Sequence, residues 1–459
     1  MVRGKKHSLA ESCVDGSLDS KRPPKHAKTT AASSPANKEE PQPPILPETI
    51  YYEAKRLQRI HPYYHKFATY AKGRWVGRSI FDVFSREFRD RPAAYYLEAI
   101  AQGLIEINNK RVDRDTVVRN SDLVTHYIHR HEPPVTTQPL GVVEHVSDGL
   151  LLVDKPGSIP VHPTGRYNYN SVTKILEIKH GYKDLYPINR LDRLTSGLML
   201  VGLNANVART MERHFRDHRI QKEYVCRVRG VFPEGNVVCD QPIRVVAHKL
   251  SLNCVDPKDG KPSLTEFCRL STDGQHSIVY CRPKTGRTHQ IRVHLQFLGF
   301  PIANDPLYCN REVWGDAMGK NGALPLLDPK QKTHDDAALA EVEKFDNDKL
   351  PKMGGRRDTD NIEPWRPLVE RMEEWKTKQE LIERISGEID KGDVERVCDK
   401  CMDPVMPDPT EDELCIWLHA WRYSGPGWSY ETPLPEWAAK AAEHIDRVKY
   451  HPDENSVSG

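Results

Sequence analysis

The sequence predicts an α+β fold built on a mixed sheet, and three patterns support this prediction. Short apolar strands outnumber helices over residues 140–310. These strands do not alternate with helices in the strict rhythm of a doubly wound parallel sheet. The helices that do occur have clear end signals: Asn204 can cap a helix over 205–219, and Gly299 can end one over 290–298.

The composition indicates two globular units plus tails in a chain of 459 residues. No apolar run approaches the ~18 residues that a membrane span needs, and the N-terminus lacks the apolar region of a secretory signal. Ten cysteines without framework spacing indicate a reducing compartment. We expect a cytoplasmic or nuclear protein. A mitochondrial location stays open, although the acidic residues Glu11, Asp15 and Asp19 are unusual for a transit peptide.

The first 135 residues divide into a tail and a basic region. Residues 1–49 are rich in Ser, Pro, Lys and Ala, so we expect a disordered tail. Its segment 21–25 has the composition of a nuclear localisation signal, or simply of a solvated basic stretch. Residues 51–131 hold 15 Lys and Arg against 9 Asp and Glu, a net charge of +6. Such a basic module in a nearly neutral chain suggests a nucleic-acid surface.

The basic region predicts two helices, over 79–88 and 93–102, followed by Gly103, a strand over 104–107 and an Asn-rich turn. This order resembles the S4 type of RNA-binding unit. Within that reading Arg74 and Arg78 are candidate phosphate contacts, and the alternative is an ordinary solvated helix face.

Strands are predicted over 149–153 and 197–203, and Tyr224 and Val228 alternate on a third strand. Residues 311–400 hold 17 Lys and Arg against 22 Asp and Glu, so we expect an acidic, partly disordered insertion. One helix is predicted inside it, over 367–385. Apolar and aromatic residues return over 414–440.

The motif with the clearest chemistry places Asp192 between Arg190 and Arg193, just before the turn Thr195-Ser196-Gly197. Fixed positive charge and turn donors favour the ionised carboxylate and lower its pKa. Such an Asp suits a nucleophile or an electrostatic anchor better than a proton donor. A surface ion pair beside a turn is the alternative.

Three further motifs accompany this run: a strand over 222–230, the run over 283–295 that continues to Tyr308, and the strand and loop over 151–163. In this order and spacing the four motifs resemble the RluA family of pseudouridine synthases, over about residues 140–310. Segments 70–78, 129–135 and 418–426 are similar to the eukaryotic branch of that family that modifies tRNA at position 32.

The resemblance implies the organisation of the chain and the reaction. It implies a disordered basic tail (1–49), an S4-like RNA-binding region (50–135), a pseudouridine synthase core (136–310), an acidic insertion (311–400), a segment that completes the core (401–445) and a tail (446–459). The reaction breaks the N1–C1′ bond of uridine and bonds C5 to C1′, so no cofactor is needed. The implied partner is the anticodon stem-loop of tRNA, bound by a monomer away from membranes.

The resemblance also assigns residues. Asp192 is the nucleophile or stabilises positive charge at C1′, Tyr224 lies against the target base, and Arg292 ion-pairs with Asp192. Arg190 would enter the space that the flipped uridine leaves. The remaining implied RNA contacts are Arg193, Arg287 and Lys155.

One position departs from the family pattern, because Asn189 stands where a His usually precedes Arg-Leu-Asp. An Asn can keep the hydrogen bonds of the loop but cannot titrate. A catalytically weak RNA-binding or tRNA-folding factor is therefore the alternative function.

We expect no metal site. Cys398 and Cys401, with Cys415 and His419 downstream, have ligand types suited to zinc, but only one Cys-x-x-Cys pair is present. Reduced thiols are the preferred interpretation. His289 and His294 are five apart on a predicted helix, a poor spacing for shared ligation, so we expect them to pack or to face RNA.

Overall fold

The computed structural model describes residues 50–88, 91–146, 149–248, 250–324, 365–386, 398, 400–401, 407–441 and 443–445. The predictions for the tails (1–49 and 446–459), for segment 21–25 and for most of the acidic insertion lie outside these residues. No helix within the described ranges is long and apolar enough to cross a membrane.

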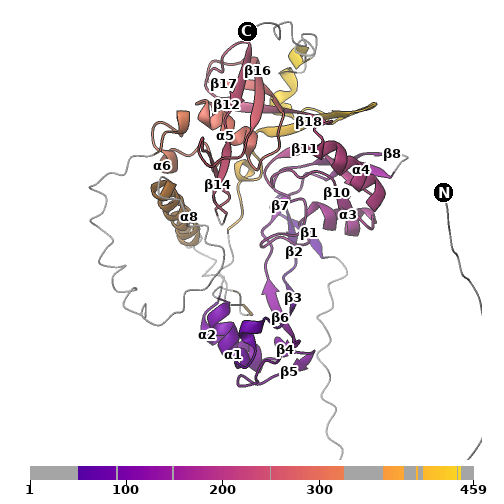
Figure 1. Ribbon diagram of the computed structural model, residues 1–459, viewed down its shortest axis with the longest axis vertical. Helices are drawn as coiled ribbons and strands as arrows, with labels where there is room; N and C mark the ends of the chain where they lie inside the picture. The colour runs from indigo at the N-terminus through magenta and orange to yellow at the C-terminus, as the bar shows by residue number, and fades with distance from the viewer. Residues whose placement is uncertain are drawn as a thin grey trace, which may run out of the picture. The chain divides into compact units, whose positions relative to one another are not determined.

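The central element is a ten-stranded sheet in the order β13-β16-β17-β12-β18-β11-β9-β8, with β10 beside β11 and β19 beside β18 (Figure 1). Of the strand pairs described in this sheet, β11 and β18 run parallel and the others antiparallel. The predicted α+β class with a mixed sheet is therefore confirmed. The strands are β8 Gly141–Val146, β9 Leu150–Lys155, β10 Tyr186–Pro187, β11 Ser196–Gly202, β12 Gln221–Arg229, β13 Asn236–Asp240, β16 Leu264–Thr272, β17 His276–Pro283, β18 Leu418–Gly425 and β19 Trp428–Glu431.

Strand β18 comes from the segment where apolar residues return, and it lies in the middle of the sheet between β12 and β11. Its contact with β11 requires Gly197, which has φ +109°. A Cβ on Gly197 would lie 2.2 Å from the Ala420 carbonyl oxygen, so a side chain there would push the two strands apart. This glycine therefore serves the strand contact as well as the turn that the sequence suggests.

The helices around this sheet begin and end close to the predicted positions. The Asn204 side chain caps α4 by accepting the N–H groups of Asn206 and Val207, as predicted, and α4 ends at Arg216 rather than Arg219. Helix α4 packs on β10 and β11, whereas α5 packs on β15, β16 and β17 (Figure 1). The helices are α3 Val172–His180, α4 Ala205–Arg216, α5 Gln290–Phe297, α6 Arg311–Trp314 and α8 Arg366–Ser386.

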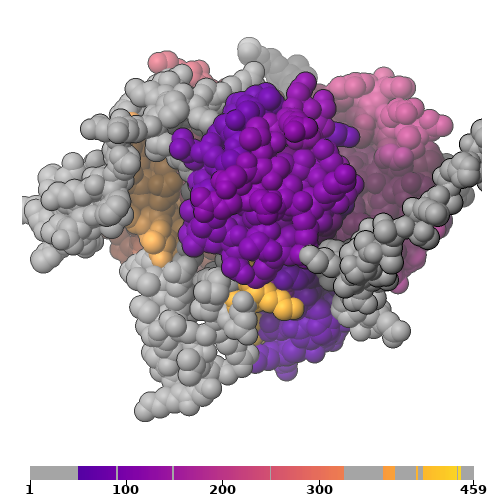
Figure 2. All heavy atoms as spheres, turned by 90° about the horizontal axis from the view of Figure 1, so that it is seen from below, coloured from indigo at the N-terminus to yellow at the C-terminus, as the bar shows by residue number. Residues whose placement is uncertain are grey.

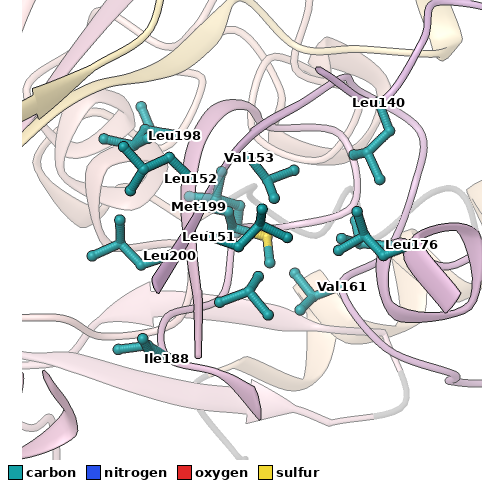
Figure 3. Packing of buried hydrophobic residues seen from close by; sticks show 14 of the residues in the cluster. Leu140, Leu151, Leu152, Val153, Val161, Leu176, Ile188, Leu198, Met199 and Leu200 are labelled. Atoms are coloured by element: carbon teal, nitrogen blue, oxygen red, sulfur yellow. The ribbon is translucent and has the colours of Figure 1, made fainter. Parts of the chain in front are cut away.

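The core beneath the catalytic motif is centred on β9 and β11. Leu151, Val153 and Met199 are completely buried and pack with Val161 and Leu176 in one apolar cluster (Figure 3). Each such side chain contributes about 1.5–3 kcal/mol by leaving water. The loop that carries Asp192 is therefore attached directly to one of the most tightly packed strands in the protein.

Residues 63–130 form what we call the N-terminal module. Two helices pack on a four-stranded sheet of order β3-β6-β4-β5. Ser79 caps the first helix, and Asn108 and Asn109 make the turn with positive φ. The predicted helices and strand are present, and the S4 likeness stays a prediction. The elements are β3 Tyr63–Tyr70, α1 Ile80–Glu87, α2 Ala93–Ala101, β4 Ile105–Ile107, β5 Lys110–Arg111 and β6 Leu123–Arg130.

Two small sheets complete the described structure. One joins β1 Tyr51–Ala54, β2 Leu57–Ile60 and β7 Val135–Thr136, and the other joins β14 Ile243–Ala247 and β15 Leu252–Val255. The first of them meets the C-terminal segment, where Arg59 and Asp408 form an ion pair of 2.5 Å. Figure 2 shows this neighbourhood as gold atoms beside indigo ones.

Candidate active site

The motifs of the sequence converge on one pocket. Its wall is formed by the loop over 189–192, by β12, by the segment over 283–292 and by Tyr423 of β18. The three predicted catalytic residues, Asp192, Tyr224 and Arg292, all line it. These elements are far apart in the chain and meet because β12, β18 and β11 are neighbours in the sheet.

Asp192 receives two contacts on the same oxygen. Arg292 Nη1 lies 3.2 Å from Asp192 Oδ2, and His289 Nε2 lies 3.6 Å from it. Among the described residues Asp192 Oδ1 has no hydrogen-bond partner, and the side chain is 24% exposed. One oxygen is thus fixed by the protein while the other is available to a bound molecule.

Arg292 is itself held from behind by Asp305. Its Nε and Nη2 donate to the two oxygens of Asp305 at 2.6 and 2.9 Å. Asp305 is buried and also accepts the backbone N–H groups of Leu307 and Tyr308. A bidentate pair of this kind fixes the plane of the guanidinium and so aims Nη1 at Asp192.

The electrostatics of this group keep the carboxylate ionised. Burial by itself raises the pKa of Asp192, but His289, Arg292 and Arg190 outweigh it and lower the pKa below its ordinary value. Burial lowers the pKa of His289 to about 4, so its ring is neutral at neutral pH. The fixed positive charge beside Asp192 therefore belongs to the two arginines.

His289 lies closer to the chemistry than its sequence position suggested. It precedes α5 with a left-handed backbone, φ +58°. Its Nδ1 lies 3.0 Å from the Tyr308 hydroxyl and 3.3 Å from Asn253 Nδ2, so it can accept from either and place the ring proton on Nε2, toward Asp192. His294 instead packs inside, between Thr265 and the Gln241 carbonyl.

The pocket is also lined by a chain of three polar groups. The hydroxyls of Tyr224 and Tyr423 lie 3.0 Å apart, and Asn189 Nδ2 donates to the Tyr423 hydroxyl. Asn189 Oδ1 accepts the N–H of Leu200 on β11. Burial raises the pKa of Tyr224 to about 12, so it stays protonated at neutral pH. Asn189 thus braces the loop and the tyrosine pair, a role that needs no titratable ring.

Lys155 requires a correction. The family resemblance implies that it contacts RNA, but its side chain is completely buried. Its ammonium donates to the carbonyls of Pro156, Ile159 and Arg193 at 2.9, 2.8 and 3.1 Å. Burial lowers its pKa to about 7. Lys155 is therefore a brace beneath the Asp192 loop and cannot reach a phosphate.

The hydroxyls of Thr195 and Ser196 do not donate to the Asp192 carboxylate. Ser196 contacts His419 Nδ1 at 2.9 Å rather than the loop backbone. Thr195 donates its backbone N–H to the Asp192 carbonyl, but its buried hydroxyl has no hydrogen-bond partner among the described residues. The loop is therefore stabilised mainly by Lys155 and Asn189.

The other predicted RNA contacts are at the surface. Arg190 and Arg287 line the pocket and are exposed, and Arg193 is exposed with its guanidinium 5.7 Å from the Tyr167 ring centre. Arg74 and Arg78 pair with the acidic side chains of Glu87 and Asp82 in the N-terminal module. Their positive charge is already partly balanced, so the phosphate contacts stay a prediction.

Sequence reasoning missed Asp305, Tyr423 and Lys222 as parts of the site. Lys222 lines the pocket and donates to the Thr285 carbonyl, and burial lowers its pKa to about 8. All three stand inside runs that carried the family resemblance. Their place inside these runs was the available signal.

Comparison with known proteins identifies the family. Residues 149–297 match the family model described as RNA pseudouridylate synthase. The human pseudouridylate synthase RPUSD2 is 42% identical over 413 residues, covering 85% of this chain and 75% of that protein. The mitochondrial tRNA pseudouridine(32) synthase of Saccharomyces cerevisiae is 39% identical, covering 84% and 77%.

The tRNA pseudouridine(31) synthase of the same yeast is 29% identical, covering 84% of this chain and 96% of that protein. The matches extend over most of each protein, and the family-model match spans positions 192, 224 and 292 of this chain. On this similarity the chain belongs to the RNA pseudouridylate synthase family and has the mixed, largely antiparallel sheet of a pseudouridine synthase.

Proposed function

We propose that this enzyme isomerises uridine to pseudouridine in tRNA, at position 32 of the anticodon stem-loop. The observation that carries the proposal is the ionised Asp192, fixed through Oδ2 by Arg292 and open at Oδ1 to the pocket. The substrate follows from two relatives whose names specify tRNA, at positions 32 and 31. The higher identity with the position-32 enzyme favours that site.

The proposed reaction uses the pocket in three stages. The N1–C1′ bond breaks while Asp192 stabilises the positive charge at C1′ or bonds to it. The uracil then turns so that C5 faces C1′, and the C5–C1′ bond forms. The C5 proton is lost and N1 gains one, so atoms balance without an external reactant. Because the released base stays bound, one carboxylate suffices where a retaining glycosidase needs two.

Tyr224 and Arg292 have separate roles in this scheme. Tyr224 forms the wall against which the base turns, and its raised pKa keeps its hydroxyl protonated. Arg292 keeps Asp192 ionised after RNA has expelled water from the pocket, when an unpaired charge would be costly.

RNA binding is proposed to combine the pocket rim with the N-terminal module. Exposed Arg190 would occupy the space of the flipped uridine, and Arg193 and Arg287 would contact phosphates beside it. The module would act as an S4-like unit, with Arg74 and Arg78 on its basic surface. We propose a monomer in the cytoplasm or nucleus, with mitochondria as the alternative that the yeast relative's name raises.

The test is tritium release from tRNA transcripts that carry 5-tritiated uridine. Wild type should release tritium, and Asp192→Asn should release none while binding tRNA equally well in a filter assay. Asp184→Asn is the matched control, because Asp184 is exposed on a nearby loop and does not line the pocket. A transcript with cytidine at position 32 should abolish release.

Each failure has a distinct meaning. Release that persists from the cytidine-32 transcript would overturn the position but keep the activity. Tight binding without release from any tRNA would instead support the tRNA-folding alternative.

A further inference from the structure

Four metal-ligating side chains from two distant segments meet at the end of β6. His129 lies on β6, the last strand of the N-terminal module, and His131 directly follows that strand, whereas Cys398 and Cys401 come from the segment near the end of the insertion. One ligand atom of each residue lies within 4.8 Å of the others. Cys398 Sγ lies 3.4 Å from His129 Nδ1, although 269 positions separate the two residues.

The structure corrects the grouping that the sequence suggested. Cys415 and His419 do not join this cluster: Cys415 packs against Gly157, and His419 contacts Ser196 and Thr432 inside the main sheet. The partners of the Cys-x-x-Cys pair are instead two histidines near the start of the chain. Sequence spacing could not reveal this, because the four residues are brought together only by the fold.

The local backbone suits shared ligation. His129 and His131 are two residues apart at the end of an extended strand, so both imidazoles can project from the same side. Their ring centres are 4.9 Å apart. The Lys400 N–H lies 3.4 Å from Cys398 Sγ and donates to it, a contact that stabilises a thiolate.

The size and burial of the cluster fit a zinc ion. Zinc–sulfur bonds of about 2.3 Å and zinc–nitrogen bonds of about 2.0–2.1 Å put tetrahedral ligand atoms about 3.3–3.8 Å apart. The widest pair here would have to close by about 1–1.5 Å, which side-chain rotation can supply. His129 is 5% exposed and Cys401 1%. Two thiolates and Zn²⁺ sum to zero charge, which suits such burial.

We propose that His129, His131, Cys398 and Cys401 bind one structural zinc ion that fastens the C-terminal segment to the N-terminal module. Four protein ligands leave no open position, so the site would have no direct part in catalysis. A disulfide between the two cysteines would use neither histidine and would not persist in a reducing compartment.

The neighbouring contacts show what the ion would stabilise. Glu132, next to His131, is buried and accepts the Tyr63 hydroxyl and the backbone N–H groups of Asn168, Tyr169 and Asn170 in the catalytic part of the chain. Arg91 of the module donates to the Cys401 carbonyl at 3.1 Å. A zinc ion would thus close a three-way junction of module, core and C-terminal segment, and so hold the module in place for RNA.

The test begins with the zinc content of the full chain, purified under reducing conditions without a metal-affinity tag and measured by mass spectrometry of the metal. We expect about one zinc per chain. Cys398→Ser and His131→Gln should each remove it. Cys415→Ser is the matched control, because Cys415 lies outside the cluster, and should retain it.

Cobalt substitution then tests the ligand set without depending on variants that fold poorly. Co²⁺ added to the stripped wild-type chain should saturate at one equivalent, with a thiolate charge-transfer band and the visible bands of a tetrahedral site. Folded, reduced wild-type chain that retains no zinc and gives no thiolate band would overturn the proposal. So would a zinc-free chain whose mass is lower by two hydrogens, since that would show a disulfide.

Discussion

Replacing Asp305 by Asn tests whether Asp305 positions the Arg292 guanidinium, because the substitution leaves the positive charge of Arg292 unchanged. Asp305 has no exposed surface and accepts four hydrogen bonds, two from the Arg292 guanidinium and two from backbone N–H groups. The Asn keeps the volume and one acceptor but loses the negative charge. Arg292 would then keep Asp192 as its only anionic contact among the described residues.

Breaking a buried ion pair by removing one partner costs about 3–5 kcal/mol. Because Asp192 still lies 3.2 Å from the guanidinium, we expect the lower end, about 3 kcal/mol. Urea denaturation of both proteins measures this loss. The exposed pair of Arg311 and Asp316 provides the control, and Asp316→Asn should cost about 0–1 kcal/mol.

The substitution should also slow the reaction, because the Arg292 guanidinium loses the bidentate contact that orients it toward Asp192. If the bond from Arg292 to Asp192 weakens by the about 1.5–3 kcal/mol of a charged hydrogen bond, kcat should fall about 10- to 150-fold. KM for tRNA should not change, because Asp305 is out of reach of RNA. Single-turnover tritium release measures the rate. An unchanged kcat in a destabilised but folded protein would refute the positioning role, and a raised KM alone would refute the geometry.

Three other predictions test the same site. Lys155→Met should lower the free energy of unfolding by about 2–4 kcal/mol, since three buried carbonyls lose their donor. If Lys155 bound phosphate instead, the substitution would reduce the salt dependence of tRNA affinity and leave the stability unchanged. Tyr423→Phe should cost about 1–2 kcal/mol and slow the reaction through Tyr224, measured by denaturation and single-turnover rates. The rate should not fall as the pH drops from about 7 to about 5. The lowered pKa of Asp192 keeps its active anion over that range and His289, with a pKa of about 4, stays neutral, while Lys155 and Lys222, with pKa values of about 7 and about 8, gain or keep their protons. A loss of rate on acidification near about pH 6.5 would mean that a histidine titrates in the reaction.

Local sequence signals predicted the parts of the fold that depend on neighbouring residues. The cap at Asn204 and the helix before Gly299 are present because their signals act within one turn of helix. The predicted strand that carries Tyr224 is present, although its side chains do not alternate between buried and exposed, since both Val225 and Cys226 are buried. The motif around Asp192 likewise predicted a fixed, ionised carboxylate, and the lowered pKa agrees.

Long-range contacts could not be predicted in this way. Lys155 looks like any exposed lysine in sequence, and only the closing of β9 against the Asp192 loop shows that backbone carbonyls surround it. Asp305 lies thirteen positions after Arg292, and only the fold shows that the two side chains form a bidentate pair. His129 and Cys398 are 269 positions apart in the sequence, so no local pattern could predict that they meet.

The Asp192 loop and its partner Arg292 are held in place by other side chains of the protein. Lys155 holds the Arg193 carbonyl, Asn189 holds β11 and Tyr423, and Asp305 holds Arg292, and each of these bonds joins two groups of the protein. Under the proposed mechanism, a carboxylate held in this way by protein groups needs little reorganisation when charge develops at C1′. In that mechanism the uracil turns while Asp192 supplies a fixed charge and Tyr224, whose raised pKa keeps its hydroxyl protonated, forms part of the wall.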